Sequence, residues 1–149
     1  MEKYEKTIVS KLNVLLATYE LHYQNLRALH WNIKGTYFFE LHLKYEELYT
    51  RAQVVIDDLA ERILTYESKP LHTFSDYIKN SVIKENGYIS DGRDGMKYIV
   101  EAQKILLEME REIFVLAGEE NDEGTAAYMS GLIGEKEKTT WMFNAWLSK

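Results

Sequence analysis

The chain has 149 residues, of which 46% are hydrophobic and 28% charged, a composition typical of one globular domain spanning residues 1–149 rather than a disordered chain. It contains no cysteine, which excludes disulfides and thiolate metal sites and suits a reducing cytoplasm, where we expect the protein to be located. Its net charge of −6, and the lack of an apolar run approaching ~18 residues, argue against a broad basic surface for nucleic acid and against a membrane-spanning helix.

Four long segments carry apolar residues at three- and four-residue steps, the spacing that predicts amphipathic helices. In chain order they run from about Tyr4 to Ile33, from Phe38 to Tyr66, from Ser90 or Asp91 to Gly118, and from Asn121 or Asp122 past Ala145. The apolar stripe of the fourth segment includes Trp141 and Met142. The connection between the second and third segments contains SDYIKNS, which we expect to form a short helix with Ser75 as its N-cap.

The lengths of the connections predict how these helices are arranged. Short joints follow the first and third long helices, so each of these two pairs should form an antiparallel hairpin. The middle connection, of about 25 residues, is long enough to cross the length of a bundle. We therefore predict an all-α fold, a ferritin-like four-helix bundle with a short extra helix in the long connection between the second and third long helices.

The second helix carries an ordered series of possible metal ligands. His42 and Glu46 are four residues apart and so share one face of the helix, and Asp57 and Glu61 repeat this spacing. At ~100° per residue, the step from Glu46 to Asp57 adds only about 20° of rotation, so the two pairs lie on nearly one stripe. His42 and Asp57 are nevertheless about 22 Å apart along the helix, too far to bind one metal ion.

A second copy of the chain could supply the ligands that lie too far away within one helix. If two copies of the helix pack antiparallel about a two-fold axis, His42 and Glu46 of one copy face Asp57 and Glu61 of the other, which produces two equivalent sites. The short hairpin also brings His30, at the end of the first helix, beside the start of the second. Nitrogen and oxygen ligands without sulfur suit Fe(II), Mn(II) or Zn(II), and the excess of carboxylates favours iron or manganese.

Other interpretations of these residues stay open. A histidine on an apolar face is most often a packed core or interface residue, the interpretation we adopt for His22 and His72. The acids of the second helix could form a solvated face together with Arg51 and Arg62. A metal site inside one bundle would use a Glu-x-x-His motif, and none of the four histidines has a glutamate three residues before it, so such a site is not expected.

The first two helices resemble the signature of the Dps family, the miniferritins named as DNA-binding proteins from starved cells, in the stretches ALHWNIKGTYFFELHLKYEELY and VVIDDLAERIL. The helix pattern extends this resemblance over essentially the whole chain. It implies a ferritin-like subunit, twelve of which form a hollow shell, with ferroxidase centres at two-fold subunit interfaces. Carried over by position, the metal ligands are His30, His42, Glu46, Asp57 and Glu61.

The resemblance also implies a chemistry. Dps proteins oxidise Fe(II), usually with hydrogen peroxide, and store the ferric product inside the shell, which protects against oxidative damage. Iron would occupy each interface as a di-iron pair, or as one tight and one transient ion. Trp31 resembles the near-site tryptophan of the family, and it is a candidate radical sink or, equally, a packing aromatic.

Among the departures from the family pattern, two bear on function. Glu46 stands where the family more often has Asp, and its extra methylene could shift one metal position. The lysine-rich tail of DNA-compacting members is missing, so we do not expect DNA binding. The alternative function is that of a DNA-coating nucleoid protein with little ferroxidase activity.

The acids at the start of the fourth helix could line an iron-entry pore or cap the helix; they are Glu119, Glu120, Asp122 and Glu123.

Overall fold

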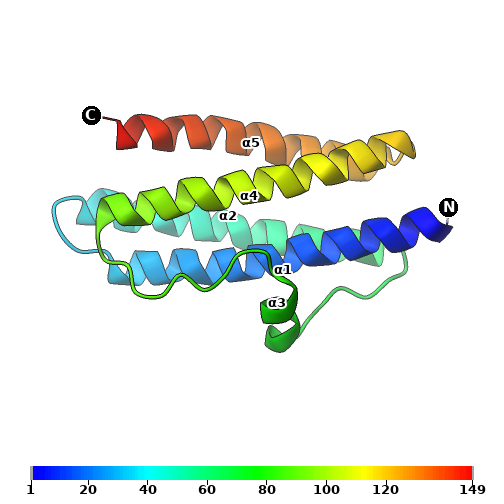
Figure 1. Ribbon diagram of the computed structural model, residues 1–149, viewed down its shortest axis with the longest axis horizontal. Helices are drawn as coiled ribbons and strands as arrows, with labels where there is room; N and C mark the ends of the chain where they lie inside the picture. The colour runs from blue at the N-terminus through cyan, green and yellow to red at the C-terminus, as the bar shows by residue number, and fades with distance from the viewer. Residues whose placement is uncertain (1, 149) are drawn as a thin grey trace.

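The computed structural model describes residues 2–148, which form five helices and, within that range, no strand. The helices are α1 (Glu2–Asn32), α2 (Phe38–Leu64), α3 (Phe74–Asn80), α4 (Gly92–Glu119) and α5 (Glu123–Leu147). The four long helices lie side by side, and short α3 lies outside them against α1 (Figure 1). The predicted all-α, ferritin-like bundle with a short extra helix is confirmed. None of these helices is both long enough and apolar enough to cross a membrane.

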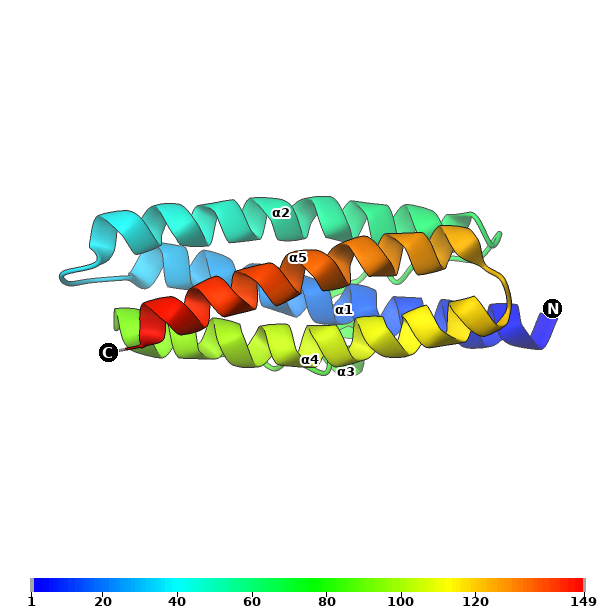
Figure 2. The ribbon, with the colours of Figure 1, turned by 90° about the horizontal axis from the view of Figure 1, so that it is seen from above.

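The connections position the ends of the helices. Helices α1 and α2 form one antiparallel hairpin and α4 and α5 another, as the views in Figures 1 and 2 agree. The crossover from α2 to α4 runs back along α1, and the backbone N–H of Lys34 donates to the carbonyl of Ser90 at its far end, at 3.0 Å. Gly35 adopts φ +101° in the tight turn between α1 and α2, a conformation that favours glycine. This turn sets the start of α2 beside the end of α1.

Most of the predicted apolar stripes face the interior. Ile8, Leu12, Leu59, Ile99 and Leu106 are all fully buried in one cluster between the four long helices. Burial of such side chains is the main driving force for folding, at roughly 25 cal/mol per Å² of apolar surface.

The stripe predicted for α5 is wrong in its second half. Trp141 and Met142 are exposed, at 67% and 40%. The predicted Met129 and Leu132 are buried, and beyond them the inward positions of α5 are Lys136 and Phe143, which continue the helical period. A lysine therefore occupies a place in the core where the sequence pattern suggested only apolar residues.

The helix starts follow ordinary capping chemistry. Asp91 and Asp122 are the N-caps of α4 and α5 and accept hydrogen bonds from the backbone N–H groups of Asp94 and Thr125, so each helix begins at the second of its two predicted starting positions. The predicted cap of α3 is wrong by two residues. Thr73, not Ser75, accepts from the backbone N–H of Asp76, because α3 begins at Phe74 and Ser75 lies within its first turn.

Gly95 of α4 lets this helix pack closely against Tyr45 of α2. A Cβ at position 95 would lie 2.5 Å from the Tyr45 hydroxyl, which is buried and has no hydrogen-bond partner among the described residues. We expect Gly95→Ala to destabilise the fold by ~1–3 kcal/mol through overpacking, and Tyr45→Phe to be neutral or slightly stabilising. Thermal unfolding of the two single variants and the double variant measures the coupling. If Gly95→Ala costs as much in the Tyr45→Phe background as in the parent, the hydroxyl is not the obstacle.

Candidate metal centre

His30 and His42 meet where the first hairpin closes. His30 lies in the last turn of α1 and His42 in the first turns of α2, and their rings stack with centroids 3.7 Å apart and planes 13° from parallel. The Nδ1 atom of each ring lies within hydrogen-bond distance of the other residue's backbone carbonyl, at 2.6 Å from His30 to His42 and 2.8 Å from His42 to His30. Each histidine thus holds the other in place.

This exchange of hydrogen bonds determines which nitrogen is free. A carbonyl oxygen only accepts, so we assign the proton of each neutral ring to Nδ1, which leaves a lone pair on Nε2. Neither Nε2 takes part in a hydrogen bond with the described residues, and Glu46 Oε1 lies 3.8 Å from His30 Nε2. A backbone carbonyl that fixes the tautomer and orientation of a metal-binding imidazole is a common device in metalloproteins.

Two aromatic rings enclose the histidine pair. Phe38 stacks on the ring of His42 at 4.9 Å and 15°, and Tyr49 packs its ring edge-to-face with His30 at 5.3 Å. The stack is therefore confined from both ends before any metal binds. Sequence reasoning missed both aromatics, although Phe38 lies four residues before His42 and therefore on the same helix face.

One chain brings together only part of the predicted ligand set. His30, His42 and Glu46 gather at one end of the first hairpin, while Asp57 and Glu61 lie about 22 Å farther along α2 at ~1.5 Å per residue. Within residues 2–148, no three His, Asp or Glu side chains are close enough to hold a metal ion. The remaining carboxylates would have to come from another chain, as the two-fold arrangement predicts.

The other acids of α2 are occupied. Glu47 pairs with Lys44 at 2.8 Å, and Asp58 accepts a hydrogen bond from the Tyr128 hydroxyl at 2.8 Å. Asp57 and Glu61, by contrast, are exposed and make no hydrogen bond or ion pair with the described residues. Among these acids, the two predicted ligands are therefore the ones that keep their carboxylates available.

Trp31 and the two remaining histidines lie outside this group. The Trp31 ring is 57% exposed and rests against the Arg27 guanidinium at 4.9 Å. His22 is buried within the bundle, as expected of a core residue, and its Nδ1 contacts the Tyr98 hydroxyl at 3.2 Å. His72 is exposed and so is not a core residue of the single chain, and its alternative placement at a subunit interface stays a prediction.

The fold and this histidine pair define a class, that of ferritin-like proteins built on a four-helix bundle. The family described as ferritin-like domain matches residues 9–149. The chain belongs, within that class, to the Dps family. It is 38% identical over 142 residues to the DNA protection during starvation protein of Porphyromonas gingivalis, covering 95% of this chain and 89% of the relative.

Solved structures lead to the same family. Dps from Vibrio cholerae O1, described as a member of a broad superfamily of ferritin-like diiron-carboxylate proteins, has a TM-score of 0.96 and 51% identity, covering 98% of this chain and 92% of that one. Dps from Bacillus brevis has a TM-score of 0.95 and 32% identity, covering 98% of each chain. The family to which this chain belongs is therefore one of diiron-carboxylate proteins, in which iron binding is expected.

Proposed function

We propose that this protein is a ferroxidase and iron store, which oxidises Fe(II) with hydrogen peroxide, or with oxygen, at centres shared between two subunits. The ferric product would be held in a hollow shell of twelve subunits in the cytoplasm. The single observation that supports the proposal most is the enclosed pair His30 and His42, whose Nδ1 atoms contact backbone carbonyls while their Nε2 atoms make no hydrogen bond with the described residues.

The outer face of α2 supports the sharing of the centre between subunits. Leu43, Val54 and Leu64 are all about half exposed there, at 57%, 47% and 55%. At ~100° per residue they fall on the same side of the helix as Asp57 and Glu61. Exposed apolar side chains grouped around unpaired carboxylates suit a surface that another subunit covers. An antiparallel copy of α2 would bring Asp57 and Glu61 to the histidine pair.

The proposed reaction balances without another redox partner. Two Fe(II) ions give one electron each to hydrogen peroxide, the O–O bond breaks, and two protons from solvent complete two water molecules. The products are two Fe(III) ions and water, and no hydroxyl radical is released. His30, His42, Glu46, Asp57 and Glu61 would hold the iron as a di-iron pair or as one tight and one transient ion. Trp31 would serve as a sink for any unpaired oxidising equivalent.

Particle mass and iron oxidation together test the proposal. We expect a particle of twelve subunits that consumes about one peroxide per two Fe(II) when Fe(II) is added anaerobically and peroxide follows. The measurements are light scattering for the mass and ferric absorbance for the turnover. A particle of one or two subunits, or ferric absorbance no faster than in a protein-free solution, would contradict the proposal.

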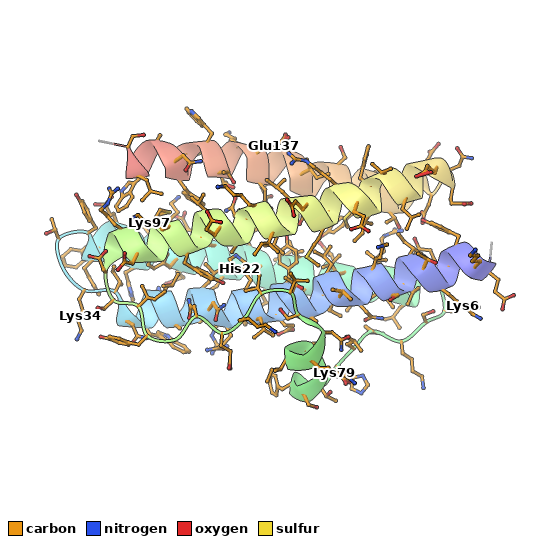
Figure 3. All side chains as sticks on the ribbon, viewed as in Figure 1. Lys6, His22, Lys34, Lys79, Lys97 and Glu137 are labelled. Atoms are coloured by element: carbon orange, nitrogen blue, oxygen red, sulfur yellow. The ribbon has the colours of Figure 1, made fainter. Side chains whose placement is uncertain are left out.

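DNA coating is the second candidate function, because relatives are named for DNA protection during starvation. The basic residues of this chain do not favour it. The four lysines labelled in Figure 3 lie on different elements, namely α1, the turn between α1 and α2, α3 and α4. Near the start of α1, Lys6 lies 3.9 Å from Glu2, and Lys11 pairs with Glu112 at 2.5 Å. These ion pairs offset the positive charge of a possible basic arm.

We therefore expect no retardation of duplex DNA in a gel-shift assay at low salt. Binding through lysines to phosphates would weaken steeply as salt is added, which makes a salt series the appropriate control. Strong retardation at low salt that disappears with added salt would instead favour the DNA-coating function.

A further inference from the structure

A polar cluster lies inside the bundle, away from the histidine pair, where α1, α4 and α5 face one another. Glu110 of α4 is completely buried. Its Oε2 atom accepts a hydrogen bond from the Tyr19 hydroxyl at 2.5 Å and lies 2.9 Å from the ammonium nitrogen of Lys136. Its Oε1 atom is buried and has no partner among the described residues. A buried carboxylate is costly unless a cation compensates it.

The contacts of Lys136 match the recognition of an ammonium ion. Its Nζ lies 5.0 Å from the centroid of the Tyr19 ring, over the ring face, in addition to its contact with Glu110. A carboxylate on one side and an aromatic face on another is a combination that attracts ammonium groups. The Lys136 side chain is only 8% exposed, so this contact is well shielded from water.

Lys136 is the cation that compensates the charge of Glu110, because the neighbouring charged groups pair with each other and the nearby histidine is neutral. Arg51 donates from Nε to both carboxylate oxygens of Glu135, at 3.0 Å each, so these two charges offset each other. Burial, helped by the charge of Lys136, lowers the pKa of His22 to about 3, so this ring is neutral at physiological pH. Among residues 2–148, Glu110 is the buried carboxylate and Lys136 the buried ammonium, and their charges balance each other.

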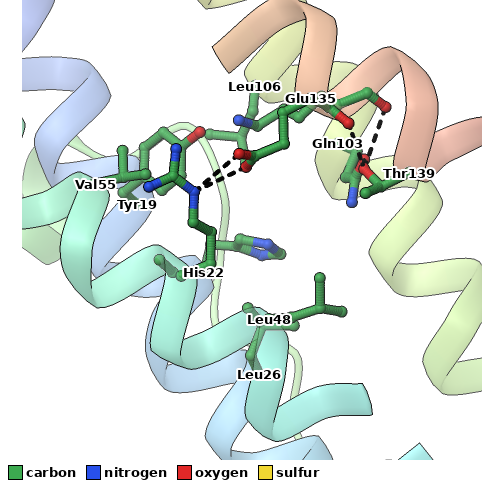
Figure 4. Close-up of a pocket in the computed structure, with 12 residues that line it drawn as sticks. Tyr19, His22, Leu26, Leu48, Val55, Gln103, Leu106, Glu135 and Thr139 are labelled. Carbon is green, nitrogen blue, oxygen red and sulfur yellow. Dashed lines mark hydrogen bonds and ion pairs between the residues drawn. The ribbon is translucent and has the colours of Figure 1, made fainter. Parts of the chain in front are cut away.

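The place of the cluster in the fold is informative. Ferritin-like di-iron proteins hold metal in the bundle core, between carboxylates and histidines of facing helices. In this bundle, a pocket of about 50 Å³ adjoins the polar cluster, and its lining includes Tyr19, His22 and Lys136 (Figure 4). No trio of metal-binding side chains surrounds it within residues 2–148.

From these contacts we infer that the bundle interior is a binding site for an ammonium cation rather than a metal ion, and that the chain fills it with its own Lys136. Glu110 supplies the negative charge, Tyr19 supplies both the aromatic face and a hydrogen bond that holds the carboxylate, and the adjoining cavity leaves room for a small amine. This inference is independent of the proposed iron oxidation.

Removing the charge of Lys136 tests the first half of the inference. We expect Lys136→Met to lower the unfolding temperature of the assembled protein by on the order of 10 °C, because it leaves a buried carboxylate uncompensated. Adding Glu110→Gln should recover most of the loss, and Lys138→Met, at an exposed lysine two residues on, should change nothing. A Lys136→Met variant as stable as the parent, or a double variant no better than the single one, would overturn the inference.

Adding a small amine to a variant that lacks the Lys136 side chain tests the second half of the inference, namely that this site binds an ammonium ion. We expect methylammonium chloride to raise the unfolding temperature of Lys136→Ala, with an effect that grows with concentration as for any ligand of the folded state. Tetramethylammonium, which is too bulky and lacks N–H donors, and Mn(II) should have no such effect at equal ionic strength. Rescue by Mn(II), equal rescue by both ammonium ions, or rescue that survives Glu110→Gln would show that no ammonium site exists there. If Lys136→Ala does not fold, the unfolding temperatures of Lys136→Met with and without Glu110→Gln remain the test of the inference.

Discussion

Mixed assemblies of His42→Ala and Glu61→Ala subunits should recover ferroxidase activity that neither variant has alone. Each proposed centre takes His30, His42 and Glu46 from one subunit and Asp57 and Glu61 from its neighbour. A mixed pair therefore contains one centre with both defects and one with none. With random reassociation of equal amounts, half of the pairs are mixed, so about a quarter of all centres should be intact.

The control for this experiment uses two defects in the same half of the centre. Mixing His42→Ala with His30→Ala should restore nothing, because every pair then lacks a histidine in both centres. Each single variant should lose at least ~10-fold in the rate of ferric absorbance after peroxide is added, since a missing ligand weakens metal binding. Exchange of subunits must be verified by mass. Verified exchange without recovery in the first mixture would mean that the centre is not shared.

The stability of the protein should fall in mild acid because of His22. Burial lowers the pKa of this ring from 6.5 to about 3, with a further contribution from Lys136. Between these two values the unfolded chain binds a proton that the folded chain does not, so stability decreases as the pH falls from 6.5 towards 3. The expected contribution is about 3 kcal/mol of lost stability near pH 4.5 relative to neutral pH.

Comparison with a variant isolates this contribution from other titrations. His22→Asn keeps an acceptor for the Tyr98 hydroxyl, and we expect its unfolding temperature to fall less between pH 7 and pH 4.5 than that of the parent. The matched control is His72→Asn, the same substitution at an exposed histidine outside the bundle. Burial raises the pKa of Glu20 and Glu110, which opposes the trend equally in all three proteins. Parallel curves for the parent and His22→Asn would refute the assignment.

The bundle was predictable because its helices obey simple rules. Apolar spacing located the four long helices, and the lengths of the two kinds of connection determined the hairpins and the crossover. The errors occur where side chains of mixed character are involved. Lys136 lies in the core and Trp141 on the surface, and periodicity cannot reveal that a buried carboxylate on another helix attracts the lysine.

Only part of the candidate site could be placed from the sequence, and its role in binding metal stays a prediction. The shared helix face of His42, Glu46, Asp57 and Glu61 follows from helix geometry alone, and their separation along α2 is the reason that we propose a second subunit. The stacking of His30 on His42 depends on the turn at Gly35, and the exchange of hydrogen bonds with backbone carbonyls depends on that stacking. Such contacts are determined by backbone positions that a pattern of residue types does not specify.

The exchange of hydrogen bonds between His30 and His42 has a consequence for when iron chemistry can begin. It is made by residues only twelve positions apart, so each folded subunit already holds the histidine half of the proposed centre in place. On the proposed assembly, the other half arrives only with a neighbouring subunit. An isolated subunit would then be chemically silent, and oxidation would start only where a container for the ferric product already exists. On this proposal, iron oxidation would depend on subunit association.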